Sequence, residues 1–295
     1  MLGRVRQRLP DKAKAALRKV RVLLLSAGLP KRKQFSQPDA EAEASGCISV
    51  VVAINGPYTV IHRCLGSLEH YAPRAEVILV DDGCSKEIAD SLKNFQARNG
   101  WKLIRHDSTL GHSRATEAGA RVATRPILCL LNSDTIITPW CWKAIVDAFA
   151  SDLEIGAAGP STSWAVGSRQ TIEAAMHCRH VWNDSQVNAY AQRLVKRSQG
   201  KRLMDLPEVN GFAFFIRRAL WEELEGFDPN LPDYGNESEL CLRILQRGLR
   251  LVWIQDSYIH HLGGQSYGRL SEEEVLLKFA AARRYINSKH PRPLP

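Results

Sequence analysis

Four short apolar runs, separated by helical patterns, constrain the fold of this chain most. The runs are "ISVVVAIN" (48–55), "EVILV" (76–80), "KLIR" (102–105) and "ILCLL" (127–131). Runs this short and this rich in β-branched or apolar residues are typical of central parallel strands that are buried on both faces. The segments between them place apolar residues at helical spacing, over 60–71, 86–100 and 113–124. We therefore predict an α/β fold with helices around a mostly parallel central sheet.

Polar side chains follow three of these runs. They are Asn55 after the first run, Asp81 and Asp82 after the second, and Asn132 and Asp134 after the fourth. Right-handed crossovers place the carboxyl ends of parallel strands at one edge of the sheet, where open α/β sheets bind ligands. We expect these five side chains to meet at that edge and to form part of a binding site.

The second half of the chain is less regular. It contains a strand pattern over 211–217, a helical pattern over 237–248, a strand pattern over 249–254 and a glycine-containing loop over 260–266. We predict three parts: a basic helix and linker (1–46), an α/β half (47–160) and a less regular half of the same domain (161–295).

The positive charge is concentrated at the amino terminus. Of the net charge of +9, residues 1–46 contribute +7, with eleven Lys or Arg and four Asp or Glu, and the rest contribute +2. A nearly neutral body argues against nucleic acid as a partner. Residues 11–25 have the pattern of a basic amphipathic helix, which fits either a peripheral anchor on an anionic membrane or a helix packed on the body. The polar stretch 31–46 is expected to be a linker.

Cysteine usage and hydropathy indicate the compartment. The seven cysteines form no CxxC pair and several lie inside apolar runs, so we expect reduced thiols. The apolar stretch 20–30 is too short to cross a bilayer, and no secretory cleavage site follows it. These features predict a cytoplasmic protein, peripheral on the inner face of the membrane if residues 11–25 are an anchor.

Each candidate acid has two interpretations. Asp81 and Asp82 could accept hydrogen bonds from a nucleoside, or they could cap a turn before the helix at 86–100. Asp134 could hold a divalent cation together with a diphosphate, or it could start a turn before a helix that opens at Thr138 and Pro139.

The acids and histidines of the second half also have a structural and a functional interpretation. Glu237 and Glu239 open the helix at 237–248, where the helix dipole alone favours acids by ~0.3–1 kcal/mol. A general base would need one of these carboxylates within hydrogen-bonding distance of an acceptor hydroxyl. A histidine such as His260 or His261 is more often structural than a metal ligand.

Taken in order, six stretches over residues 47 to about 268 resemble the inverting family 2 glycosyltransferases of GT-A fold, of the bacterial polysaccharide or rhamnosyl type. "VILVDDGCS" is similar to the family's nucleotide loop, "LGHSRATEAGARVATRPILCLLNSDT" to the stretch that ends in the metal motif, and "HHLGGQS" to its late histidine loop. The other three are "ISVVVAIN…HRCLGSL", "GPSTSWAVGSRQTI" and "VNGFAFFIRRALWEELEGFDPNLPDYGNESELCLRILQRG", the last being similar to the acceptor-side and base motif.

The resemblance implies a role for each candidate residue. Asp134 would coordinate Mg²⁺ or Mn²⁺ on the donor diphosphate with His261 close by, and Glu237 would be the catalytic base. Donor-binding residues would be Asn55, Asp81, Asp82, Arg114 and Asn132. Acceptor-side residues would be Asn210, Gly211 and Glu239.

The expected reaction is the transfer, with inversion, of a hexosyl or deoxyhexosyl group from a nucleoside-diphosphate sugar to a hydroxyl of a glycan, lipid-linked or protein acceptor. In the three-part division, 47–160 would bind the donor and 161–295 would supply the acceptor side and the base. The sequence specifies neither the sugar nor the acceptor.

Several positions depart from the family pattern. Ala53 and Glu117 replace a frequent proline and a frequent asparagine, and Asn236-Glu237 stands where an acid pair is expected. These departures leave open a nucleotide-sugar-binding module with impaired turnover. A sugar nucleotidyltransferase is the weaker alternative, because "AINGPYTVIH" lacks the glycine-rich, arginine-bearing loop which that class carries after its first strand.

Overall fold

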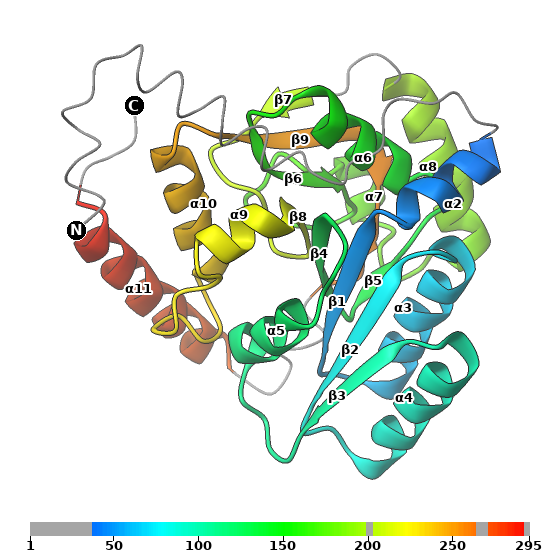
Figure 1. The fold of residues 1–295 in the computed structure, drawn as a ribbon, viewed down its shortest axis with the longest axis horizontal. Helices are drawn as coiled ribbons and strands as arrows, with labels where there is room; N and C mark the ends of the chain where they lie inside the picture. Colours follow the sequence, from blue (N-terminus) through cyan, green and yellow to red (C-terminus); the bar gives the residue numbers. More distant parts are fainter. Residues whose placement is uncertain (1–36, 199–202, 264–270, 292–295) are drawn as a thin grey trace.

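The computed structural model describes residues 37–198, 203–263 and 271–291, and its centre is an eight-stranded sheet in the order β3-β2-β1-β4-β8-β6-β9-β7 (Figure 1). The strands are β1 (Ile48–Ile54), β2 (Glu76–Asp82), β3 (Lys102–His106), β4 (Ile127–Asn132), β6 (Ile155–Ser161), β7 (Leu203–Asp205), β8 (Ala213–Arg217) and β9 (Arg250–Tyr258). Strands β1 to β4 pair in parallel, whereas β8 runs antiparallel to both β4 and β6. The sheet is therefore mostly parallel, as predicted, and strands from both sides of residue 160 belong to it.

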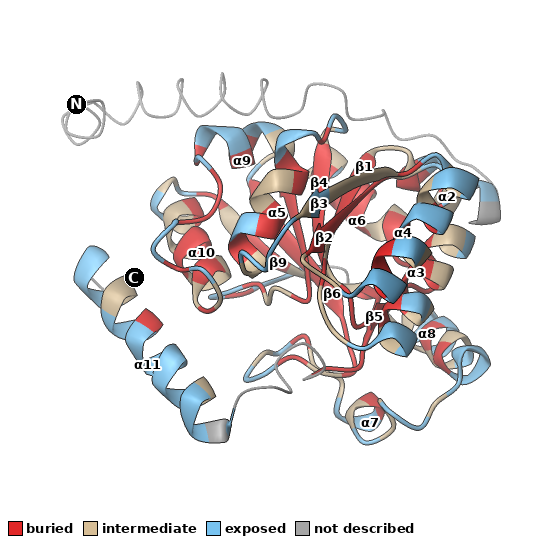
Figure 2. Ribbon diagram, turned by 90° about the horizontal axis from the view of Figure 1, so that it is seen from below, coloured by how far each residue is buried: buried red, intermediate tan, exposed pale blue. Residues whose placement is uncertain are grey.

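Helices cover both faces of this sheet (Figure 2). One face carries α3 (Tyr58–Tyr71), α4 (Lys86–Asn99) and α6 (Trp142–Ser151), and the other carries α5 (His112–Arg121), α9 (Arg218–Glu223) and α10 (Asn236–Gln246). The remaining helices are α2 (Gln37–Ser45), α7 (Glu173–Met176), α8 (Asp184–Ser198) and α11 (Glu272–Lys289).

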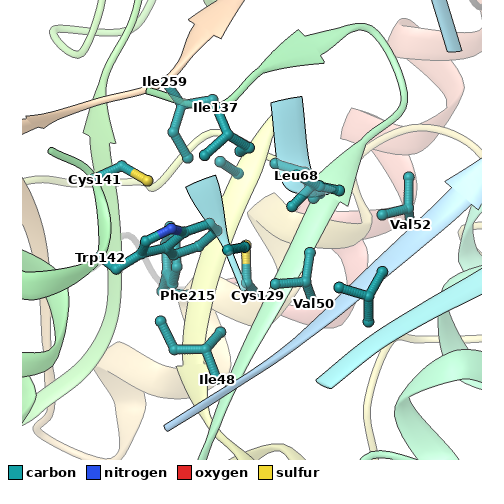
Figure 3. Close-up of a cluster of buried hydrophobic side chains, with 14 of the residues drawn as sticks. Ile48, Val50, Val52, Leu68, Cys129, Ile137, Cys141, Trp142, Phe215 and Ile259 are labelled. Atoms are coloured by element: carbon teal, nitrogen blue, oxygen red, sulfur yellow. The ribbon is translucent and has the colours of Figure 1, made fainter. Parts of the chain in front are cut away.

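The core lies between the sheet and these helices. Val50 and Val52 of β1 point to the α3 face, and Val51 points to the α5 face, so the strand is buried on both sides. On the α3 face the Trp142 and Phe215 rings meet edge to face, with centroids 6.2 Å apart (Figure 3). Burial on both faces is why the runs of β1, β2 and β4 are largely apolar instead of alternating. The run over 102–105 was expected to be a central strand, but it forms the edge strand β3, which has no fully buried residue and carries Lys102 and Arg105.

Two predictions were wrong: the linker over residues 37–45 and the helix start at Thr138. Residues 37–45 of the expected linker form helix α2, and the Glu41 carboxylate accepts hydrogen bonds from the backbone N–H groups of Trp142 and Lys143, at 2.9 and 3.0 Å. Helix α6 therefore begins at Trp142 and is capped by a residue about a hundred positions away. It does not begin at Thr138, whose hydroxyl donates instead to the Tyr258 carbonyl.

The segment expected to be a loop at 260–266 begins as a strand. His260–His261 form β10, which pairs antiparallel with β5 (Thr135–Ile136) in a separate two-stranded sheet. Residues 11–25, and with them the predicted amphipathic helix, lie outside the described residues. Within the described ranges, no helix combines the length and the apolar character needed to span a bilayer.

Two helical glycines test the packing of this fold. A Cβ at Gly119 of α5 would overlap Val51 of β1 and lie 3.0 Å from Val80 Cγ2, whereas a Cβ at Gly66 of α3 would meet no atom within 4 Å. We expect Gly119→Ala to lower the free energy of unfolding by about 1–3 kcal/mol through overpacking. Gly66→Ala should raise it by about 1 kcal/mol through helix propensity. Urea titration of both variants measures the two effects, and equal shifts would contradict the packing of α5 on β1.

Candidate active site

Asp134 and His261 meet at the carboxyl edge of the sheet. Asp134 follows β4 and precedes β5, and His261 lies in β10, which pairs with β5. The Asp134 carbonyl accepts from Leu262 N–H at 3.0 Å, and His261 Nε2 lies 3.0 Å from Asp134 Oδ1. Both residues are buried, with 3% and 4% exposed. The small β5–β10 sheet thus brings together residues that are 127 positions apart.

Aromatic rings and hydrogen bonds fix the orientation of the His261 ring. Its faces contact the rings of Phe212, with centroids 5.3 Å apart, and Trp164, at 5.4 Å. The Ser163 hydroxyl donates to the His261 carbonyl and accepts from its N–H. Gly263 has a φ of +70°, and any Cβ there would overlap the Trp164 ring. These contacts fix the direction in which Nε2 points.

The hydrogen bonds of His261 leave two acceptor atoms, His261 Nε2 and Asp134 Oδ1, facing each other. His261 Nδ1 lies 2.7 Å from the Trp164 carbonyl, which can only accept, so Nδ1 carries a hydrogen. A neutral imidazole then has a lone pair on Nε2, directed at Asp134 Oδ1, which is also an acceptor. A cation between the two atoms, either a proton or a metal ion, resolves the conflict.

The pair fits a divalent metal ion of the kind implied by the sequence. A ligating histidine commonly donates its other ring N–H to a carbonyl, as His261 does, and carboxylate oxygen suits Mg²⁺ or Mn²⁺. Within the described residues, no cluster of three or more His, Cys, Asp or Glu side chains is arranged to hold a metal. Asp134 and His261 would therefore supply two ligands and leave other positions to phosphate oxygens and water.

Asp81 and Asp82 end β2 with their carboxylates bonded to the protein. Asp81 accepts from Cys84 N–H at 2.8 Å and pairs with Arg105. Asp82 accepts from the N–H groups of Leu110 and Gly111, at 2.9 and 3.0 Å, and contacts His106 Nδ1 at 2.8 Å. The contacts of Asp81 are those expected of an acid that caps a turn. The contacts of Asp82 instead fix the loop that leads into α5. A role of either acid at the nucleoside stays a prediction.

The other predicted donor residues surround the same edge. The Asn55 carbonyl accepts from the Ser133 hydroxyl at 3.0 Å, which ties the end of β1 to the segment before Asp134. Asn132 ends β4, and its N–H donates to the Phe212 carbonyl at 2.9 Å. Arg114 lies in the first turn of α5 with an exposed side chain. The fold brings their backbones to the predicted edge, and donor contacts by their side chains stay predictions.

Glu237 lies in the first turn of α10 and is 19% exposed. Its carboxylate occupies the space above Gly211, where any Cβ would overlap it. The absence of a side chain at Gly211 thus makes room for Glu237, while the adjacent Asn210 N–H donates to Gln170 Oε1 at 2.9 Å. Burial, helped by the negative charge of Glu208, raises the pKa of Glu237 to about 7. Such a carboxyl can lose and accept a proton near neutral pH.

Two neighbours on α10 have structural contacts. Asn236 is fully buried, and its Nδ2 donates to the Ser113 hydroxyl at 2.9 Å, which ties α10 to α5. Glu239 is also fully buried and pairs with Arg243, Lys289 and His290 at 2.7, 2.8 and 3.0 Å. The prediction that Glu239 faces an acceptor is therefore wrong: its charge is neutralised by α11 and by the next turn of α10.

His112 is the main residue that the sequence analysis missed. It opens α5, and its Nε2 lies 3.9 Å from Glu237 Oε1. Burial lowers the pKa of His112, and the negative charges of Asp233, Asp82 and Asp134 oppose that shift. His112 is thus within the field of the acids at the sheet edge and lies close to Glu237. Its position directly after Gly111 at a helix start was the available signal.

The structure is thus an α/β domain with a buried Asp–His pair at the carboxyl edge of its sheet and a carboxyl of raised pKa at the start of α10. A family model, "Glycosyl transferase family 2", matches residues 49–224, which is more than half of the chain. The chain belongs to this family of glycosyltransferases. A sequence search of curated proteins found no match.

Solved structures with a similar fold are GT-A glycosyltransferases. GalNAc-T7 with UDP, GalNAc and Mn²⁺ is 21% identical with a TM-score of 0.57, over 72% of this chain and 42% of its own. The mannosyltransferase PcManGT from Pyrobaculum calidifontis, with GDP-Man and Mn²⁺, is 14% identical with a TM-score of 0.59, over 97% of this chain and 74% of its own. S. aureus TarS 1–349 with UDP-GlcNAc is 14% identical, with a TM-score of 0.55, over 82% and 65%. These likenesses establish the predicted GT-A fold.

The raised pKa of Glu237 has a consequence for stability. In the unfolded chain this carboxyl has its ordinary pKa of 4.5, and in the folded protein the pKa is about 7. The folded state binds the proton more tightly, so the stability that the group contributes is complete below pH 4.5 and is lost as the pH rises through 7. Glu237→Gln cannot lose a proton. Wild type therefore loses stability between pH 5 and pH 8 and the variant does not. The free energy of unfolding of Glu237→Gln minus that of wild type should rise by on the order of 2 kcal/mol over this range.

Urea titrations at the two pH values measure this difference. Glu222→Gln is the matched control, because Glu222 is an exposed acid on α9 with 58% of its side chain accessible. A Glu237→Gln difference as independent of pH as that of the control would contradict the burial of this carboxyl.

Proposed function

We propose that the protein is an inverting glycosyltransferase that moves a hexosyl or deoxyhexosyl group from a nucleoside-diphosphate sugar to an acceptor hydroxyl. The observation that carries the proposal is the geometry of Asp134 and His261, whose facing atoms could share a divalent cation at the edge where α/β sheets bind ligands. The donors in the similar structures, GDP-Man and UDP-GlcNAc, support this donor class.

In the proposed reaction Glu237 accepts the proton of the acceptor hydroxyl. The acceptor oxygen forms a bond to the anomeric carbon as the bond from that carbon to the diphosphate breaks, so the configuration inverts in one displacement. A pKa of about 7 keeps Glu237 partly deprotonated at neutral pH and basic enough to take the proton. His112, 3.9 Å away, lies where it can orient the carboxylate.

Asp134 and His261 would hold Mg²⁺ or Mn²⁺. Such an ion supplies positive charge that stabilises a departing diphosphate. The rigid packing of His261 between Phe212 and Trp164 keeps its Nε2 directed at that position before the donor binds. Asn55, Asp81, Asp82, Arg114 and Asn132 remain the proposed donor-side residues, and Asn210 and Gly211 the proposed acceptor-side residues.

The central test is a transfer assay. With UDP-, GDP-, CDP- and TDP-sugars, glycan and lipid-linked acceptors and Mn²⁺, we expect Glu237→Gln to lower kcat by on the order of 10²–10⁴ while donor binding persists. Asp134→Asn should reduce both kcat and metal-dependent donor binding. Wild-type kcat should rise with pH through about 7, as Glu237 loses its proton.

Glu222→Gln again serves as the control and should keep full activity. Donor binding without transfer or donor hydrolysis, with any donor and acceptor tested, would favour the impaired binding module. Buried Asn236, which cannot act as the second acid, is the observation that supports that alternative.

We also propose that residues 11–25 hold the protein at the anionic cytoplasmic face of a membrane, close to lipid-linked acceptors of polysaccharide biosynthesis. Removal of residues 1–36 should abolish sedimentation with vesicles of phosphatidylglycerol and leave sedimentation with neutral vesicles unchanged. The truncation stops before α2 because Glu41 caps α6. Undiminished sedimentation of the truncated protein would contradict the anchor.

A further inference from the structure

A groove between α3 and α8 lies outside the candidate active site. It has a volume of about 690 Å³, within the range of ligand sites in proteins. One side is a stripe of α3 from Tyr58 to Tyr71, and the other includes Asp184 and Asn188 of α8. The two helices lie side by side in Figures 1 and 2. At a rise of 1.5 Å per residue the stripe is roughly 20 Å long. We propose that this groove binds a neutral oligosaccharide.

The charge of the lining favours a neutral ligand. Arg63 of α3 lies 2.7 Å from Asp184 and also donates to the Trp182 carbonyl at 2.8 Å, so its charge is neutralised within the groove wall. The lining nevertheless contains polar side chains that are not ion-paired, including the exposed hydroxyl of Thr59. A ligand rich in hydroxyl groups matches such a surface, because each hydroxyl both donates and accepts.

Asn188 provides an unmet hydrogen-bond requirement. Its Nδ2 donates to Tyr71 Oη at 2.6 Å, while its Oδ1 has no hydrogen-bond partner among the described residues. Exchanging the amide oxygen and nitrogen would leave the nitrogen without a partner instead. Asn188 lines the groove, and its Oδ1 is buried in this arrangement. The χ2 torsion of asparagine is broad, so a rotation of the amide would be the route by which a ligand hydroxyl could bond to Oδ1.

Gly66 keeps the middle of the groove open. It lies inside helix α3, where glycine is less favourable than any residue except proline. No neighbour requires its small size, because a Cβ would meet no atom within 4 Å. Gly66 is thus unfavourable for the helix and unnecessary for packing. Its effect is to leave free space along the stripe, which a bound oligosaccharide requires.

Aromatic rings mark both ends of the stripe. Tyr58 is 38% exposed, and its ring contacts that of His62 with centroids 5.4 Å apart. At the other end Tyr71 contacts His70 edge to face at 4.4 Å. Aromatic rings offer apolar faces to the C–H side of a sugar ring while polar groups bond to its hydroxyls. Both tyrosines line the groove, so a sugar chain that lies along it would pass both of them.

Saturation-transfer NMR with the neutral cellotetraose, mannotetraose and chitotetraose, and with the anionic tetragalacturonate for comparison, tests the proposal. EDTA is present and nucleotide is omitted, so the result does not depend on the proposed transfer reaction. At least one tetrasaccharide should receive saturation from the wild-type protein. Gly66→Trp, which fills the groove, should abolish the signal, and Asn188→Ala should weaken binding by about tenfold.

Asn94→Trp is the matched control, because it adds the same ring at an exposed position on α4, outside the groove. This variant and Asp134→Asn should bind like wild type. The proposal is overturned if no neutral tetrasaccharide binds, if folded Gly66→Trp and Asn188→Ala both bind like wild type, or if tetragalacturonate alone binds. Loss of binding in Asp134→Asn would assign the sugar to the active site and would also overturn it.

Discussion

The active site depends on two acceptor atoms that face each other. His261 has its Nδ1 hydrogen committed to a carbonyl and its Nε2 directed at the Asp134 carboxylate, 3.0 Å away. A proton or a metal ion between the two atoms resolves this conflict, and the pair is held by the β5–β10 pairing and by two aromatic rings. A metal ion held there, at the carboxyl edge of an α/β sheet, would be placed to bind a diphosphate.

The carboxylates around this edge have two kinds of environment. Asp82 accepts from two backbone N–H groups, and Glu239 pairs with the cations of Arg243 and Lys289 and contacts His290, so their charges are compensated inside the protein. Glu237 instead lies over Gly211 with burial raising its pKa to about 7. The contrast identifies Glu237 as the carboxyl that can exchange a proton near neutral pH, and Glu239 as part of the scaffold.

The sequence predicted the strands and the edge because burial on both faces leaves a local pattern, as β1, β2 and β4 show. It did not predict α2 or the start of α6, because the cap from Glu41 joins residues that are far apart in the chain. His112 and the rings of Trp164 and Phe212 were missed for the same reason, since their roles arise from contacts across the fold. Glu239 was misassigned because the dipole pattern of a first turn does not reveal partners on another helix.

The most direct measurement is anomalous scattering from crystals soaked with Mn²⁺ and a nucleoside diphosphate, with UDP, GDP, CDP and TDP tried in turn. We predict a manganese peak within about 2.5 Å of both an Asp134 carboxylate oxygen and His261 Nε2, with phosphate oxygens among the other ligands. Nucleotide density without a peak there, and with Asp134 still bonded directly to His261, would contradict the account.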